Sequence, residues 1–393
     1  MFNTNLDILE PTAWIETYIA NLYPNRPILA RAATTIRGQS IDSQVAQRNK
    51  EVRVPRPAKP NGSKQYTGNG YTYDDPDVSD ASLVMNNIWY DGFKVNKWDQ
   101  KFSMVDLVNM YFQPYMEDLM NQINADMKDP IRQFEAAFGY LNGGNLTQID
   151  DDDIRNAKRF LEKRKFLRSG AEGFIDADAR YYLTGQPLFV NANQRGSLDV
   201  QISGEMGPAF GFRNFHVDPL GIVSPAVTFS GTASGTAAEG DKIVPIDDGA
   251  GGAATPGQPG DIVAIGSSPT QDDFYVIDET PTGGDNTANL YLKEPLRKAV
   301  ANNDPIVGKA GQTQAFYDPS AIVLVTAGVE PLDTPNNGIR TATGFDPVNR
   351  VTFQVTVTQN DEGVKVLIES LYGYKNFMPD RGIRYEMGTT AKV

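Results

Sequence analysis

The sequence predicts a mixed α+β protein in which helical and strand-forming stretches are segregated along the chain. Two patterns predict this class: a long amphipathic helix pattern near residue 110, and short strand patterns that fill most of the chain after residue 225. The chain has 393 residues, of which 40% are hydrophobic and 22% are charged. A chain of that length and composition can form more than one compact unit with a buried core.

Two residue counts restrict the chemistry. The sequence contains no cysteine and a single histidine, His216. Disulfides, thiolate nucleophiles, cysteine-ligated metals and multi-histidine metal sites are therefore excluded. We expect no enzymatic activity, no cofactor and no metal. Because His216 lies in an alternating strand pattern, we interpret it as a hydrogen-bonded structural residue.

Neither a secretory signal nor a membrane helix is expected. The amino end has no basic segment ahead of an apolar run. The most apolar runs, such as residues 321–325, are far shorter than the roughly 20 residues that a membrane helix needs. We therefore expect a soluble protein, and the lack of cysteine fits a reducing cytosol.

The charge is spread unevenly. The whole chain carries −13, yet residues 30–64 contain eight basic and two acidic residues, a local net charge of +6. Such a segment can bind nucleic acid or lie across the acidic surface of a neighbouring copy. Aromatic residues are not interleaved with the basic ones, so we favour the second interpretation. The candidate contact residues are Arg48, Lys50, Arg53, Arg56, Lys59 and Lys64.

The first hundred residues predict a short helix and then a two-stranded excursion. Residues 11–23 favour a helix with one apolar side, formed by Trp14, Ile15, Tyr18, Ile19 and Leu22. The excursion is expected to run out along Val52 and back along Trp89, and prolines limit its first strand to an edge or a projecting loop. The residues expected to share one face of the returning strand are Leu83, Met85, Trp89, Phe93 and Val95.

The strongest helix pattern begins at Ser103, which forms a capping box with Asp106. Pro114 is expected to kink this helix or to mark a short break. Two parallel apolar rows follow the helix: Leu107, Tyr111, Tyr115, Leu119, Ile123 and Met127, and beside them Met104, Val108, Phe112, Met116 and Met120.

The acidic run from Asp150 to Asp153 has two interpretations, a divalent-cation site or the start of a helix. We favour the helix because the spacing differs from that of a calcium loop and basic residues follow towards residue 165. A short strand at 174–176 and a helix at 177–183 come next.

Residues 225–311 predict a separate small β-barrel or β-sandwich, because short strand patterns alternate there with Gly, Pro, Asp and Asn. A glycine-rich stretch at 249–254 superficially fits a dinucleotide fingerprint, but prolines follow where the helix would begin, so we interpret it as a loop. Beyond it we expect a buried strand at 321–325, a hairpin that turns at 360–363, and a last strand through Ile383 and Tyr385.

Four stretches carry a resemblance to a known family: residues 93–114, 207–215, 315–322 and 371–379. In this order they resemble the major capsid proteins of tailed double-stranded DNA phages, which share the Hong Kong 97 fold. The resemblance implies a subunit that self-assembles through pentamers and hexamers into an icosahedral shell around the DNA genome, which it encloses without sequence-specific binding. The implied location is the virion, assembled in the host cytoplasm.

The resemblance also implies a domain plan and partners. The plan is an N-terminal arm (1–47), an extended loop (48–98), a peripheral domain with the spine helix (99–172), an axial domain (173–224 and 312–348), the inserted β-domain (225–311) and a carboxy-terminal peripheral hairpin (349–393). The implied partners are copies of the chain itself, a separate scaffolding protein, a portal and, as a further candidate, a decoration protein.

Three alternatives stay open. The nearest is a non-viral nanocompartment shell of the same fold. A second is a β-rich carbohydrate-binding or glycoside-cleaving protein that would use Asp247 with Asp278 as paired carboxylates. A third is another virion component, such as a tail or portal subunit.

Overall fold

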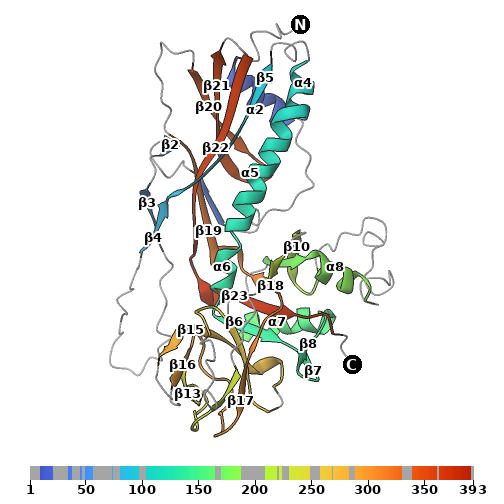
Figure 1. Cartoon of the computed structure of the whole chain (residues 1–393), viewed down its shortest axis with the longest axis vertical. Coiled ribbons are helices and arrows are strands. Elements are labelled where there is room, and N and C mark those ends of the chain that lie inside the picture. The colour runs from blue at the N-terminus through green and yellow to red at the C-terminus, as the bar shows by residue number, and fades with distance from the viewer. Residues whose placement is uncertain are drawn as a thin grey trace. The chain divides into compact units, whose positions relative to one another are not determined.

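The structure is a computed structural model of the whole chain (Figure 1). It describes residues 9–20, 34–37, 45–46, 49–55, 73, 80–96, 103–163, 170–186, 209–218, 221–223, 230–247, 257–267, 269–282, 288–329, 339–360 and 363–390. These residues form a mixture of helices and strands, which confirms the predicted α+β class.

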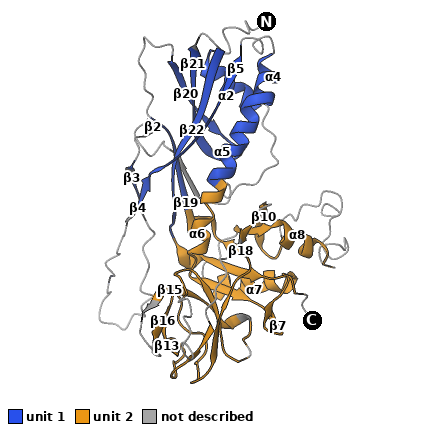
Figure 2. Cartoon of the chain, viewed as in Figure 1, with its two compact units in different colours: residues 1–25, 35–123, 323–377 blue, residues 26–34, 124–322, 378–393 orange. Residues whose placement is uncertain are grey.

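The chain folds into two compact units, each assembled from separate stretches of sequence (Figure 2). Unit 1 comprises Met1–Asn25, Thr35–Ile123 and Val323–Phe377. Unit 2 comprises Arg26–Thr34, Asn124–Ile322 and Met378–Val393.

A seven-stranded sheet forms the framework of unit 1, in the order β1-β19-β22-β21-β20, with β2 paired to β19 and β5 paired to β22. The central hairpin β21–β22 has the predicted turn, since Asn360 pairs with Gly363. The strands are β1 (Thr34–Arg37), β2 (Val45–Ala46), β5 (Asn87–Asn96), β19 (Ile322–Val329), β20 (Ile339–Asp346), β21 (Val351–Asn360) and β22 (Gly363–Asn376).

Helices pack on one face of this sheet. They are α2 (Pro11–Ala20), α4 (Met104–Leu107), the π-helical segment η3 (Val108–Phe112) and α5 (Gln113–Asp126). Their aromatic side chains meet those of the sheet: the Phe112 ring lies 6.0 Å from Trp14 and 6.4 Å from Phe353. Phe93 lies 5.6 Å from Trp14 on the same side. The predicted apolar helix rows are therefore core, although Ile19 of α2, which was expected on the apolar side, is 36% exposed.

The helix does not break at Pro114, as one form of the prediction had it: it continues from Met104 to Asp126, and the turn ahead of Pro114 is π-helical. Ser103 caps the helix, accepting a hydrogen bond from the Asp106 backbone amide, and the wider turn follows directly. Pro114 has no amide hydrogen, so a regular α-turn ahead of it would leave a carbonyl without its donor. In η3 the amide of Gln113 instead donates to Val108.

The excursion differs from the prediction in its returning strand. β3 (Lys50–Pro55) pairs with β4 (Asp80–Met85), so that Val52 lies opposite Leu83. Trp89 belongs to β5, which pairs with β22 instead. Leu83, Met85, Phe93 and Val95 are buried as expected, but Trp89 is 40% exposed. The prediction of one continuous strand was wrong because the chain changes pairing partner at Asn86.

A twelve-stranded sheet runs through unit 2 in the order β10-β9-β18-β23-β6-β15-β14-β17-β12-β13-β16, and β11 is paired to β18. The strands outside the insert are β6 (Ala136–Gly139), β9 (Ala171–Asp176), β10 (Phe212–Asp218), β11 (Ile222–Val223), β18 (Gln312–Tyr317) and β23 (Gly382–Met387). Two short strands, β7 (Leu141–Asn142) and β8 (Asn145–Leu146), pair with each other. The domain plan grouped β23 with the β21–β22 hairpin, whereas this strand pairs with β18 and β6.

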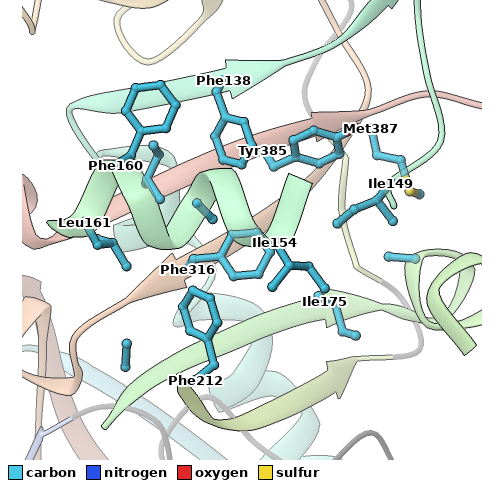
Figure 3. Close-up of a cluster of buried hydrophobic side chains, with 14 of the residues drawn as sticks. Phe138, Ile149, Ile154, Phe160, Leu161, Ile175, Phe212, Phe316, Tyr385 and Met387 are labelled. Atoms are coloured by element: carbon cyan, nitrogen blue, oxygen red, sulfur yellow. The ribbon is translucent and has the colours of Figure 1, made fainter. Parts of the chain in front are cut away.

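Helix α7 (Asp151–Lys163) packs on this sheet through Ile154, Phe160 and Leu161 (Figure 3). Phe138 and Tyr385 of the sheet face it, with ring centroids 4.9 Å apart. The other helical segments of the unit are α6 (Asp129–Arg132), α8 (Ala177–Thr184), η4 (Gln271–Asp273), η5 (Pro319–Ala321) and η6 (Pro379–Arg381). The acidic run is thus the start of a helix, as predicted.

The inserted segment forms a closed antiparallel barrel. Its strands pair in the cycle β12-β13-β16-β15-β14-β17 and back to β12, which resolves the predicted choice between barrel and sandwich. Aliphatic side chains such as Val244, Leu290 and Ile306 fill the interior. The strands are β12 (Ser230–Ala233), β13 (Ile243–Asp247), β14 (Ile262–Ile265), β15 (Phe274–Thr282), β16 (Ala288–Leu292) and β17 (Pro305–Lys309).

Candidate intersubunit surface

The two-stranded ribbon β3–β4 carries the described part of the basic segment. Lys50 begins β3, and Arg53 is exposed near its middle, opposite Ser82. The other candidate contact residues, Arg48, Arg56, Lys59 and Lys64, lie outside the described residues. Within the described part of the chain, β3 pairs with β4 alone, so its other edge has no strand partner. An unpaired edge is a template for contact with another chain.

Close packing on unit 1 holds the base of this ribbon. A Cβ added at Gly373 of β22 would lie 2.6 Å from both the Leu83 side chain and the Val84 carbonyl oxygen. Lys375 Nζ donates a hydrogen bond to the Ser82 carbonyl at 2.9 Å. Glycine at position 373 therefore allows β4 to lie directly against β22.

Three large apolar side chains are exposed along β4 and the first part of β5. Val84 is 45% exposed, Trp89 40% and Tyr90 71%. Large aromatic side chains are enriched at the energetic centres of protein interfaces. The sequence pattern placed Trp89 on the same strand face as Leu83 and Phe93, which are buried, so its exposure was not predicted.

Several buried ionisable groups of unit 2 are paired within the unit. His216 Nε2 lies 3.0 Å from a Glu172 carboxylate oxygen, and Asn214 donates to the other oxygen at 3.4 Å. Lys128 Nζ lies 2.9 Å from the Asp218 carboxylate and donates to the Gly221 carbonyl. The prediction of a hydrogen-bonded structural histidine is confirmed.

Burial shifts several pKa values, and each shift has a structural cause. Arg384 is fully buried, which lowers its pKa to about 10, while nearby Glu386 opposes that shift. Its guanidinium donates to the Gly260 carbonyl at 2.7 Å. Burial also raises the pKa of Tyr385, and its hydroxyl donates to Asp153 at 3.0 Å. These contacts connect strand β23 to the turn at Gly260 and to the first turn of α7.

The acidic run caps α7. Asp150 and Asp153 each accept a hydrogen bond from the other's backbone amide, both at 3.0 Å. Arg155 lies within 3.0 Å of Asp152 and closer to Asp151. Among the described residues, no group of three or more histidine, aspartate or glutamate side chains could hold a metal ion.

The proposed carboxylate pair of the carbohydrate alternative is not brought together. Asp247 follows Ile246, which pairs with Ala288 at one end of β16, while Asp278 follows Ile277, which pairs with Leu292 at the other end. Four residues of strand span roughly 13 Å. That exceeds the separation of roughly 5–9.5 Å that glycoside cleavage uses. The glycine-rich stretch at 249–254 lies outside the described residues.

Among the described residues, no helix has the length and hydropathy to cross a membrane.

Comparison with known proteins finds similarity in solved structures only. No family model and no curated protein matches the sequence. The chain is similar over more than nine-tenths of its length to a structure from Mycobacterium phage Che8, with 12% identity, 92% of this chain and 91% of that chain covered, and a TM-score of 0.46.

Two phage capsid structures are similar to the same extent. The capsid structure of the cyanophage P-SCSP1u is 11% identical over 93% of this chain and 89% of that chain, with a TM-score of 0.46. The mature capsid of bacteriophage PhiM1 is 12% identical over 93% of this chain and 88% of that chain, with a TM-score of 0.44.

Proposed function

We propose that this chain is the subunit of a closed protein shell and has the Hong Kong 97-type fold. The order of its elements carries the proposal. A two-stranded ribbon precedes a long capped helix, a barrel is inserted between β11 and β18, and a hairpin returns to pair with β5 beside the helix. This is the order that the sequence resemblance implies for a major capsid protein.

The ribbon supports self-assembly. It projects an unpaired edge and an exposed Arg53 from a chain that is otherwise strongly acidic. Opposite charges on neighbouring copies fix register and orientation. A closed shell repeats one contact many times, so a modest interface is sufficient once closure adds the contacts together.

The finer proposal is that the subunits form pentamers and hexamers in an icosahedral virion shell that encloses double-stranded DNA. An acidic body suits a container that does not bind its genome tightly. A separate scaffolding protein, a portal and a decoration protein are the proposed partners, with assembly in the host cytoplasm.

Sedimentation velocity of the purified protein tests the proposal. A shell subunit gives large particles with a discrete sedimentation coefficient, alone or when co-expressed with a neighbouring scaffold-like reading frame. A single 43.1 kDa species under both conditions contradicts it. Particles that contain a cargo protein and no DNA support the nanocompartment alternative.

Reversal of two ribbon charges tests the role of the basic segment. The variant Arg53→Glu, Arg56→Glu is expected to lose closed particles while its circular dichroism and melting temperature match those of the wild type. The control variant, Lys163→Glu with Arg213→Glu, makes the same charge change at exposed positions of unit 2. Normal particles from the ribbon variant would show that this ribbon is not an interface.

A further inference from the structure

The sheet of unit 1 has a second face, opposite the helices, which we call the outer sheet face. Strand register defines it, since residues paired across neighbouring strands point to the same side. Lys365 pairs with Lys94 and Thr358, while Glu369 pairs with Tyr90 and Gln354. The face comprises Ile88, Tyr90, Gly92, Lys94, Thr341, Thr356, Thr358, Lys365, Leu367 and Glu369.

This face is basic and has an aromatic centre. Lys94 and Lys365 lie directly opposite each other, a pairing of like charges that by itself destabilises a sheet. Glu369 is the remaining charged group of the face, which therefore carries two lysines and one carboxyl group, and burial raises the pKa of that carboxyl. Tyr90 is 71% exposed, Lys365 is exposed opposite Lys94, four residues along β5 from Tyr90, and Leu367 is partly buried.

The helical side of the same unit has the opposite charge. Residues 11–20 and 103–123 contain four acidic residues and no lysine or arginine. Glu16, Asp106 and Asp118 are exposed. Two large apolar side chains are exposed on the same helices, Val105 at 45% and Met110 at 53%. Unit 1 therefore has an acidic helical face and a basic sheet face, each with exposed apolar side chains.

We propose that the helical face of one copy docks on the outer sheet face of the next copy. This inference rests on the proposed shell function and names the contact between neighbouring subunits. The occupant is a second copy of this chain because the two faces of unit 1 are complementary in charge. Tyr90 is the anchor on one side, and Val105 and Met110 are the apolar partners on the other.

A contact of this kind is head-to-tail. Two different patches meet, so every copy offers one free patch on each side; the contacts close into a ring where the rotation between copies closes, and continue as an open filament where it does not. A contact between identical patches would instead pair lysines with lysines and stop at a dimer. The charge arrangement thus favours head-to-tail assembly over a dimer, and in a closed shell such contacts form rings of subunits.

Two charge variants and their mixture test the proposal. In the first variant, Glu16→Lys, Asp118→Lys and Asn121→Lys together change the helical face from −4 to +1; all three positions are exposed and none caps a helix. In the second, Lys94→Glu with Lys365→Glu makes the sheet face acidic. Each variant alone brings like charges together, and we expect at least about a tenfold increase in the protein concentration that assembly requires.

The mixture gives the sharpest result. In an equimolar mixture the two variants can alternate, which restores a complementary pair at every contact of a six-membered ring but leaves one mismatched contact in a five-membered ring, so ring-shaped clusters of six are expected to return. The comparison variants are Glu162→Lys and Lys163→Glu with Arg213→Glu, at exposed positions of unit 2, which are expected to assemble normally. Circular dichroism and thermal melting establish that each variant folds; if one does not, the neutral variants Asp118→Asn and Lys94→Gln take its place, with a smaller effect expected.

Each outcome is informative. Normal assembly of either folded variant alone, or failure of the mixture to form ring-shaped clusters of six, overturns the proposed contact. In those cases wild-type particles still form, and the shell function stands. Failure of the wild type to form any particle overturns the contact and the shell function together.

Discussion

At the residue scale, single buried cations hold the inserted barrel against the rest of unit 2. The Arg297 guanidinium donates to the backbone carbonyls of Asp272 at 3.0 Å, Phe274 at 3.3 Å and Ala137 at 3.4 Å. It also lies 4.9 Å from the Phe160 ring of α7. Arg297 therefore connects the barrel to the core sheet and to helix α7. Its planar guanidinium presents several donors in a fixed fork, which a lysine ammonium group lacks.

Replacement of Arg297 tests this role. We expect Arg297→Ala to lower the free energy of unfolding by about 3 kcal/mol, because buried acceptors and Glu294 lose their partner. Arg297→Lys should recover less than half of that loss. Urea denaturation measures both. A loss below about 1 kcal/mol for the alanine variant would show that the barrel is held by its apolar contacts alone.

Sequence reasoning identified His216 correctly but could not identify Arg297 or Arg384. The alternating strand pattern around His216 is formed by its neighbours in sequence, so the sequence alone was sufficient to interpret this residue. The acceptors of Arg297 and Arg384 are largely backbone carbonyls, and Ala137 and Gly260 reach them only after folding. No pattern of residue types predicts such partners.

At the element scale, the ribbon β3–β4 depends on one close backbone contact. Gly373 lies so near β4 that any side chain there would meet the Val84 carbonyl and the Leu83 side chain. The same end of β22 carries Lys375, which donates to Ser82. The ribbon is therefore held at its base by β22, while the other edge of β3 has no strand partner among the described residues.

We expect Gly373→Ala to displace the ribbon from β22. The overpacking costs about 1–3 kcal/mol, and limited proteolysis should cut residues 45–86 faster than in the wild type. Gly185→Ala is the matched control, since its added Cβ meets atoms no closer than 3.6 Å. Equal proteolysis of the Gly373 variant and the wild type would mean that β4 is held by other contacts.

Elements with a strong local period were predictable, and changes of pairing partner were not. The cap at Ser103, the β21–β22 hairpin and the barrel strands all follow local patterns. The strand through residues 80–96 has one continuous alternation, yet it divides into β4 and β5 with different partners. Pairing partners are set by tertiary contacts, which the period does not encode.

At the scale of the whole molecule, the inserted barrel and unit 1 differ in the surfaces that they offer to another copy of the chain. The barrel is closed, filled by aliphatic side chains and fixed to unit 2, so it has no free sheet edge of its own. Among the described residues, unit 1 carries the ribbon edge without a strand partner, the exposed Trp89 and Tyr90, and two faces of opposite charge, whereas unit 2 exposes Tyr181. Unit 1 is therefore where we place the contacts between copies.

The candidate surface could be predicted from sequence only in part. The local excess of basic residues identified the segment at 48–64 but not its geometry. Tyr90 and the Lys94–Lys365 pair were missed, because residues 94 and 365 are distant in sequence and meet only through strand register.

Electron microscopy of the purified protein, expressed alone and with a neighbouring scaffold-like reading frame, separates a shell subunit from the alternatives. A shell subunit is expected to give closed shells built from ring-shaped clusters of this chain. Discrete monomers in both preparations would contradict the shell function, and open rings without closed particles would point to a tail or portal subunit instead.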